Sequence, residues 1–386
     1  MFRVKAVFVV AVMFLFVVAA APVLVLFARS RRGRIEGTFG VALGTFLVSG
    51  LVWLCAPLVG AERPFVAGVV ALTAAVAFVP LGALASALMR PCDYGEGPVG
   101  SHFLRAEPTP ESVGWADVED EYAWILVRLV THFDPRVPTA EGRAARARVN
   151  ELLAAIAERP EYRNIARISD GQSYRLLSGE LDLEHCYSYR PEPRSPDERL
   201  GLLVFLHGHG SNYLFFVHAL RPLCDRMRVA LVAPSFGYGN WEAPGGTEAV
   251  ERAARFGVSA IDPDPGRVFL GGISQGGAGV SRAAAAHPEL FAGLIFISPT
   301  MEASVIGSEA FAEGWRGRPV LVVQGERDRN VRPESVTAAC ELMEAAGVSV
   351  AQHRDPDGGH FLFLAKLDEV TEVIAAWARG AINGAR

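Results

Sequence analysis

The chain opens with three long apolar stretches that contain no charged residue. They cover residues 6–27, 39–60 and 65–89 and are 22, 22 and 25 residues long. A helix that rises about 1.5 Å per residue needs about 20 such residues to cross a hydrocarbon core of about 30 Å. The pattern predicts a membrane region over residues 1–91 with three transmembrane helices and the lipid bilayer as a partner. The alternative is a cleaved signal peptide of about 22 residues, although its apolar core would be unusually long.

Basic residues near the ends of the spans predict the orientation of the chain in the membrane. Six of them lie in the first loop or after the third span: Arg29, Arg31, Arg32, Arg34, Arg90 and Arg105. Only Arg3, Lys5 and Arg63 lie on the opposite side. We therefore expect a multi-pass integral membrane protein whose C-terminal part is cytoplasmic.

A linker and a helical connector are predicted over residues 92–179. The first part, up to about residue 110, contains several Pro and Gly residues and has no periodicity. Residues 114–133 and 139–158 then place apolar side chains at three- and four-residue spacing, which predicts two amphipathic helices. Thr139 is the expected N-cap of the second helix. We find no reactive constellation on these helices and expect them to pack on the following domain or to bridge it to the membrane, with a substrate cap as the alternative.

From residue 180 to 386, short apolar runs alternate with amphipathic stretches. The runs cover residues 202–206, 228–232, 267–270, 294–297, 320–323 and 348–351. Several are apolar on consecutive positions, as expected for parallel strands that are buried on both faces. The pattern predicts an α/β domain with a doubly wound, mostly parallel sheet.

Charge is distributed unevenly and excludes one class of function. The net charge is −5 overall, but residues 1–91 carry +6, so the remainder carries −11. A domain that acidic is a poor nucleic-acid binder, because such binding relies on neutralising phosphates. Five scattered cysteines are too few for a disulfide scaffold.

The strongest chemical signal is a G-x-S-x-G motif formed by Gly272, Ser274 and Gly276. It directly follows one predicted strand and directly precedes a helical run at residues 279–286. A serine nucleophile on a sharp strand-to-helix turn requires small neighbours, since larger side chains would collide with the adjacent backbone. The motif alone is common in a Gly-rich chain, but this position between strand and helix indicates Ser274 as a nucleophile.

A serine nucleophile needs a base, and the base needs an acid that orients it. Asp328 lies where a buried strand runs out into a polar turn, at the strand end where open α/β sheets bind their ligands. His360 lies in a glycine-containing loop after the last predicted strand. The chain order Ser274, Asp328, His360 is the one that this motif requires. Other candidates remain: Glu326, Asp355 or Asp357 as the acid and His353 as the base.

An oxyanion hole is predicted from the segment that follows the first central strand, Leu206-His-Gly-His-Gly210. We assign the backbone N–H groups of His209 and Gln275 as its donors. His207 and His209 could also suggest a metal, but no further ligands accompany them. The aromatic side chains after the second central strand, Phe236, Tyr238 and Trp241, are candidate walls of a substrate pocket, with loop packing as the alternative.

These segments together resemble the α/β-hydrolase superfamily over residues 180–386. The pairing of Leu206-His-Gly-His-Gly210 with Gly272-Ile-Ser-Gln-Gly276 is similar to its phospholipase/carboxylesterase branch, which includes dienelactone hydrolase-like enzymes. The resemblance implies Ser274 as nucleophile, Asp328 as acid, His360 as base, and His209 with Gln275 as oxyanion donors. The three spans and the helical connector depart from those mostly soluble enzymes.

The sequence therefore predicts a membrane-anchored serine hydrolase that cleaves a carboxylic ester or thioester of a small molecule or acyl group. It implies no metal and no organic cofactor. Two rivals remain, namely a peptidase of the prolyl-oligopeptidase type and a non-catalytic membrane sensor or scaffold with a hydrolase-like binding domain.

Overall fold

The computed structural model describes residues 98–104, 130–159, 161, 182–195, 197–209, 214–236 and 240–384. The three predicted transmembrane helices lie outside these residues. Of the first predicted connector helix, only residues 130–133 are described, and they are helical. No helix in the described ranges is both long enough and apolar enough to cross a bilayer.

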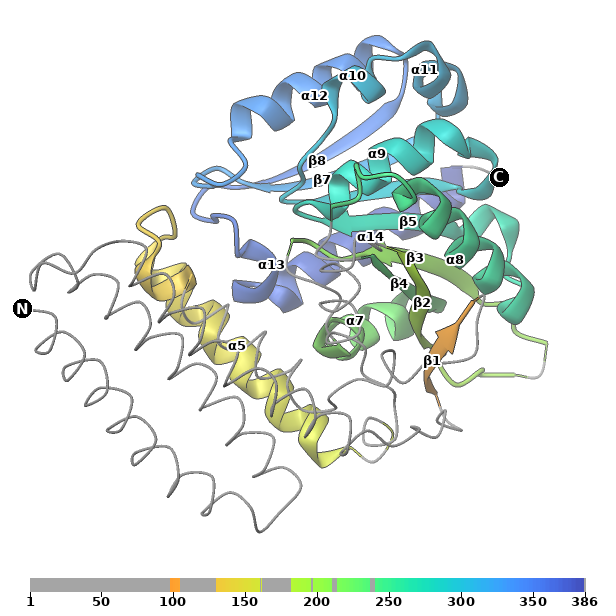
Figure 1. Cartoon of the computed structure of the whole chain (residues 1–386), viewed down its shortest axis with the longest axis horizontal. Helices are drawn as coiled ribbons and strands as arrows, with labels where there is room; N and C mark the ends of the chain where they lie inside the picture. Colours follow the sequence, from red (N-terminus) through yellow and green to blue (C-terminus); the bar gives the residue numbers. More distant parts are fainter. Residues whose placement is uncertain are drawn as a thin grey trace, which may run out of the picture. The chain divides into compact units, whose positions relative to one another are not determined.

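An eight-stranded sheet forms the centre of the described part (Figure 1). Its strands are β1 (Val99–Phe103), β2 (Asp182–Tyr189), β3 (Gly201–Leu206), β4 (Val229–Phe236), β5 (Val268–Ile273), β6 (Gly293–Ile297), β7 (Pro319–Gly325) and β8 (Ser349–Asp355). They lie in the order β1-β2-β4-β3-β5-β6-β7-β8. The pairs β1–β2 and β2–β4 are antiparallel, and the pairs from β4 through β8 are parallel. The predicted doubly wound, mostly parallel sheet is confirmed.

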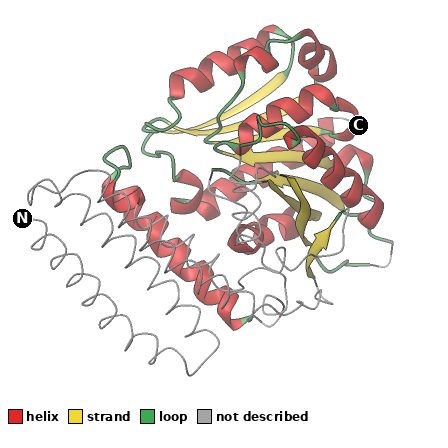
Figure 2. Cartoon of the chain, viewed as in Figure 1, coloured by secondary structure: helices red, strands yellow, loops and turns green. Residues whose placement is uncertain are grey.

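Helices cover both faces of this sheet (Figure 2). The described helices are α5 (Thr139–Glu158), α7 (Leu214–Met227), α8 (Gly246–Ile261), α9 (Gly276–Ala286), α10 (Ala303–Ile306), α11 (Glu309–Trp315), α12 (Pro333–Ala345), α13 (Leu362–Ala365) and α14 (Leu367–Gly384). Two short 3-10 helices, η4 (Pro265–Arg267) and η5 (Pro288–Leu290), precede β5 and β6.

The alternation of side chains along each strand creates two separate cores. In β3, Leu203 and Phe205 enter the core shared with α5, α7 and α14, whereas Leu202 and Val204 enter the core shared with α8, α9, α11 and α12. Successive residues of a strand point to opposite faces, so a strand between two helical layers must be apolar throughout. All six residues of β3 and of β5 are buried, which explains the consecutive apolar runs in the sequence.

All six strands predicted from apolar runs are confirmed, with ends that differ by a few residues. Two further strands, β1 and β2, were missed. Strand β1 lies within the predicted linker, so that part of the prediction is wrong, and the sheet includes residues upstream of residue 180. Both strands carry polar residues among apolar ones and pair with each other at the edge of the sheet, where Val99 lies opposite Tyr189.

The connector helix predicted over residues 139–158 is confirmed as α5, and its packing on the sheet domain is confirmed as well. Ala145 and Val149 are buried in the core that includes Leu362 and Phe363 of α13. The predicted N-cap is wrong, because Pro138 occupies that position and makes no side-chain capping bond. Thr139 is instead the first helical residue, so the helix begins one residue earlier than expected.

The strand order reverses at β3, which pairs with β4 on one side and with β5 on the other. Helices α7 and α8, which connect these strands, therefore lie in different cores. The helices that follow β3 and β5 lie on opposite faces of the sheet. Open α/β sheets bind their ligands in the crevice between such connections, beyond the carboxyl ends of the two strands. Ser274 and the segment at residues 207–209 emerge at this point.

Candidate active site

Ser274 occupies the sharp turn between β5 and α9. Its φ is +53°, a left-handed backbone conformation that is uncommon for a residue with a side chain. Three hydrogen bonds hold this backbone. The Ser274 N–H donates to Ile297 O at 2.9 Å, and the Ser274 carbonyl accepts from Thr300 N at 2.8 Å and from Gly277 N at 2.9 Å. The neighbouring strand end and the first turn of α9 thus fix the strained residue.

The glycines of the motif are required by space. A Cβ on Gly272 would lie 2.6 Å from the Gly276 carbonyl oxygen. A Cβ on Gly276 would lie within 3.0 Å of the Leu206 carbonyl oxygen at the end of β3. Both obstacles are backbone atoms, which cannot rotate away. The predicted reason for the G-x-S-x-G pattern is therefore confirmed.

The structure brings Ser274, His360 and Asp328 together in one hydrogen-bonded line. His360 Nε2 lies 3.0 Å from Ser274 Oγ, and His360 Nδ1 lies 2.9 Å from Asp328 Oδ2. The Asp328 side chain is fully buried, and that of His360 is 15% exposed. A carboxylate at Nδ1 favours the tautomer with a proton on Nδ1, which leaves Nε2 free to accept the serine proton.

Asp328 is itself held by the turn that follows β7. Its Oδ1 accepts hydrogen bonds from Asn330 N and Val331 N, both at 2.8 Å. Gln324 Nε2 lies 3.4 Å from Oδ2. One carboxylate oxygen thus binds the loop backbone and the other faces His360, so the direction of the acid is fixed before any ligand arrives.

The other candidate acids have different partners. Glu326 pairs with Arg354 at 3.1 Å, and Asp357 pairs with Arg327 at 2.5 Å. Asp355 lies at the end of β8 and pairs with Lys366. Among the hydrogen bonds of the described residues, none joins Glu326, Asp355 or Asp357 to His360.

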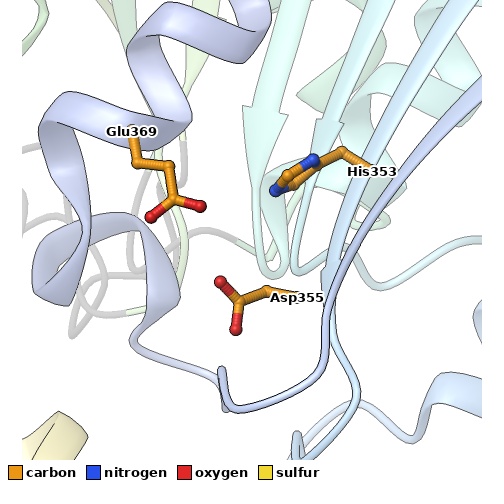
Figure 3. Close-up of side chains that lie close together, drawn as sticks. All are labelled: His353, Asp355 and Glu369. Atoms are coloured by element: carbon orange, nitrogen blue, oxygen red, sulfur yellow. The ribbon is translucent and has the colours of Figure 1, made fainter.

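A second cluster of polar side chains lies beside this loop. His353, Asp355 and Glu369 offer ligand atoms that all lie within 4.8 Å of one another (Figure 3). The Lys366 ammonium pairs with one oxygen of Asp355, while the other accepts from Asp357 N at 3.0 Å and Gly358 N at 2.7 Å. Burial alone would raise the pKa of Asp355, but these hydrogen bonds hold it below its usual value. A cation therefore already neutralises Asp355, and we assign Asp355 and Lys366 a structural role in holding the histidine loop.

The predicted oxyanion segment passes directly beside the nucleophile. A Cβ on Gly208 would lie 3.2 Å from Ser274 Cβ and 3.8 Å from its Oγ. His209 follows Gly208 and is exposed, and Gln275 follows Ser274 as the N-cap of α9. The Gln275 side chain donates to Glu242 at 2.8 Å, away from the backbone N–H that we assign as a donor. Both predicted donors thus belong to segments that flank Ser274.

His207 supports this segment from below. Its Nδ1 donates to the Gly208 carbonyl at 2.8 Å, and its Nε2 accepts from Phe236 N at 3.3 Å. Burial lowers the pKa of His207 to about 4, so the ring is neutral near pH 7. Because both ring nitrogens have backbone partners, His207 is not available as a metal ligand.

The predicted aromatic walls require a correction. Phe236 and Trp241 are fully buried and stack on each other with ring centroids 5.4 Å apart. Trp241 Nε1 donates to the His207 carbonyl at 2.9 Å. The two rings therefore fill the space beneath the oxyanion segment and offer no surface to a ligand, in line with the alternative of loop packing. Tyr238 lies outside the described residues.

One residue of the site was missed by the sequence analysis. Glu141, in the first turn of α5, accepts a hydrogen bond from Gly359 N at 2.8 Å, immediately before His360. The two residues are 218 positions apart. An acid in the first helical turn is common, so nothing in the local pattern distinguishes Glu141 from a solvated side chain.

Comparison with known proteins agrees with this architecture. Residues 203–318 match the alpha/beta hydrolase family. The sheet, the turn at Ser274 and the order of the three polar residues together define an alpha/beta-hydrolase fold with a mostly parallel eight-stranded sheet.

Individual relatives are distant. The chain is 27% identical over 138 residues to a protein of Oryza sativa subsp. japonica named "Probable carboxylesterase". This match covers 35% of the chain and 57% of that relative, so it spans less than two thirds of the relative's length. Among solved structures, fungal esterases from Rhizomucor miehei are 16% identical with a TM-score of 0.44, covering 61% of this chain and 97% of that one. A thermostable esterase is 20% identical with a TM-score of 0.41, covering 50% and 58%.

Proposed function

We propose that the chain is a serine hydrolase that cleaves a carboxylic ester or thioester through an acyl-enzyme on Ser274. The observation that carries this proposal is the line of hydrogen bonds from Ser274 Oγ through His360 to Asp328, at 3.0 and 2.9 Å. It begins on a strained turn of the type that exposes a nucleophile at the carboxyl edge of a sheet. The same three groups perform acyl transfer on several unrelated folds.

In the first half of the reaction, His360 Nε2 takes the hydroxyl proton while Ser274 Oγ forms a bond to the substrate carbonyl carbon. The carbonyl electrons move to oxygen, where the N–H groups of His209 and Gln275 stabilise the charge. The carbonyl then re-forms, the bond to the leaving alcohol or thiol breaks, and the imidazolium gives that group its proton. The acyl group remains on Ser274.

In the second half, His360 removes a proton from water, and the resulting attack on the acyl carbon releases the carboxylic acid. Asp328 remains ionised throughout and stabilises the imidazolium that forms in each half. All protons that move are returned to the products or to Ser274, so the chemistry needs no redox partner. The name of the rice relative supports an ester as the substrate.

We further propose that the enzyme is an integral membrane protein whose catalytic domain is cytoplasmic. The support is the length of the three uncharged stretches and the six basic residues on one predicted side. The test is carbonate extraction of membranes that contain the full chain, followed by protease treatment of sealed vesicles. Release of the protein from the membrane by carbonate would contradict the anchor. Digestion of the catalytic domain by protease added to the non-cytoplasmic side of the vesicles would contradict the orientation.

The catalytic proposal is tested by labelling the full chain with a fluorophosphonate probe, which phosphonylates activated serines. We expect labelling of the native protein and none of Ser274→Ala, with Ser281→Ala as a control because Ser281 is a buried serine of α9 that bonds to Gly277 O. A panel of acyl esters, thioesters and peptide amides then assigns the bond type. Preferential cleavage of amides would point instead to a peptidase. Absence of labelling and of any hydrolysis would point to a non-catalytic binding domain.

A further inference from the structure

Glu141 is a buried acid that the proposed reaction does not use. Only 7% of the residue is exposed. Its Oε1 accepts the hydrogen bond from Gly359 N at 2.8 Å. Its Oε2 is buried and has no hydrogen-bond partner in the described part of the chain. A buried oxygen without a partner costs free energy, so the position of this acid beside the histidine loop calls for an explanation.

The contact is possible because residue 359 is a glycine. A Cβ there would collide with Glu141 Oε2 and would lie 3.0 Å from Pro138 Cδ. The loop that carries His360 therefore packs directly against the N-terminus of α5. On its far side the loop continues into α13, whose side chains share a core with α5. Helix α5 thus contacts the chain on both sides of His360.

Glu141 also interacts electrostatically with both members of the His360–Asp328 pair. Burial and, to a lesser extent, the charge of Asp328 raise the pKa of Glu141 to about 7, although the Gly359 and Phe361 N–H groups and the charge of His360 oppose the shift. The other charged groups on the segments that pack around Glu141 are the Asp134–Arg136 pair before α5, Arg146 on α5, and Lys366 between α13 and α14. Of these, Asp134 also lies within electrostatic reach of His360.

We infer that Glu141 is a positioning residue for His360, whose carboxylate holds the Gly359 backbone and, when ionised, stabilises the protonated imidazole. The inference rests on the proposed serine-hydrolase function. It makes α5 a working part of the active site, in addition to its role in packing. The influence is reciprocal, because a group whose ionisation is favoured by His360 must in turn favour the charged form of His360.

A pH-dependent effect follows from this arrangement. Above neutral pH, ionised Glu141 adds a second negative charge near the imidazolium that forms in the transition state. Below neutral pH, the protonated acid still has an oxygen for the Gly359 N–H but no longer carries the charge. The amide of Glu141→Gln reproduces the protonated form at every pH.

The test compares the full-length native protein with Glu141→Gln and with Glu151→Gln, an exposed acid on the same helix that pairs with Arg148. The readout is kcat/KM for p-nitrophenyl acetate from pH 5.5 to 9. At pH 8 and above we expect Glu141→Gln to lose about three- to tenfold in kcat/KM, mainly in kcat, since an attraction between partly buried charges has this order of strength. At pH 5.5 the ratio to native should approach one. Glu151→Gln should match the native protein throughout.

A second readout does not depend on catalysis. Diethyl pyrocarbonate modifies neutral imidazole, and mass spectrometry of the peptide that contains His360 reports the pH of half-maximal modification. We expect this midpoint to move to lower pH in Glu141→Gln. The inference is overturned, and the hydrolase proposal stands, if two results are found together. The ratio of kcat/KM between the native protein and Glu141→Gln does not change with pH, and the pH of half-maximal modification is the same in both proteins. A shifted midpoint in a protein without hydrolase activity overturns the proposed function and leaves the coupling of Glu141 to His360 standing.

Discussion

The serine and the histidine of the site are held in place by different kinds of contact. Ser274 is fixed by its own neighbours in sequence and by the end of the adjacent strand, through backbone hydrogen bonds and glycine-sized gaps. His360 is fixed by side chains, two of which, Asp328 and Glu141, come from distant segments. Asp328 accepts a hydrogen bond from its ring, and Glu141 accepts one from the N–H of Gly359, the residue before it. Lys366 pairs with Asp355, whose carboxylate binds the backbone of the histidine loop.

This difference has a consequence for how each side tolerates change. Backbone atoms around Ser274 cannot move without breaking the strand order, so that side is rigid and intolerant of added atoms. The supports of His360 are flexible side chains, several of which are ionisable. We therefore expect the serine side to respond to steric changes and the histidine side to respond to charge and pH.

The largest effect is expected from removing either reacting group. Ser274→Ala and His360→Ala should each lower kcat for ester hydrolysis by about ten-thousandfold or more, and the double variant should be no worse, because the two groups act as one unit. Steady-state hydrolysis of p-nitrophenyl acetate measures this. His353→Ala, on β8, is the control. A large loss in that variant would mean that the base has been assigned to the wrong histidine.

Asp328→Asn should lower kcat by about a hundred- to ten-thousandfold while leaving the fold intact. The amide keeps an acceptor for Asn330 N and Val331 N but can no longer stabilise the imidazolium. Asp357→Asn, an exposed acid on the histidine loop, is the matched control and should retain full activity. Equal losses in the two variants would show that loop order, and not the charge of Asp328, accounts for the effect.

Gly276→Ala and Gly359→Ala compare the two sides sterically. The first should lower the free energy of unfolding by about 2–3 kcal/mol, because its Cβ meets the Leu206 carbonyl. The second should cost less, because its main obstacle is the end of the Glu141 side chain. Urea titration of the full chain in detergent measures both, with Gly380→Ala as a control since nothing lies within 4 Å of its Cβ. A larger loss for Gly359→Ala would contradict the comparison.

The stability of the histidine side should depend on pH through Glu141. Its folded-state pKa of about 7 lies above the ordinary value of 4.5, so the folded chain keeps a proton that the unfolded chain releases. The contribution of Glu141 is therefore fully present below pH 4.5 and is lost as pH rises toward 7. Relative to Glu141→Gln, the native protein should lose about 1–3 kcal/mol of unfolding free energy between pH 5 and pH 8. If the urea midpoints of the native protein and of Glu141→Gln differ by the same amount at every pH, this prediction is wrong.

The smallest effect concerns metal. Because Lys366 pairs with Asp355 within the cluster of His353, Asp355 and Glu369, we expect a chelator such as EDTA to change neither hydrolysis nor the melting temperature. A fall in melting temperature that added zinc reverses would show that the cluster binds a metal in preference to the lysine.

Some features of this fold could be predicted because their cause is local. Consecutive apolar residues in β3 and β5 reflect burial on both faces, and the glycines around Ser274 reflect a clash within a few residues. Strands β1 and β2 were missed because both carry polar residues among the apolar ones and so lack a continuous apolar run. The predicted pocket walls Phe236 and Trp241 were misplaced, since an aromatic residue in a loop has the same sequence signature whether it lines a pocket or fills the space below one.

The sequence by itself determined the parallel sheet, the turn that bears Ser274 and the order of the three polar residues, because each depends on periodicity or on neighbours along the chain. Tertiary structure alone decided which acid faces His360, which aromatic rings are buried and which helix supports the histidine loop. Glu141 and Gly359 are 218 residues apart, and only the packing of α5 against α13 brings them together. Contacts of that range depend on how whole elements pack, and no local pattern of residue types records them.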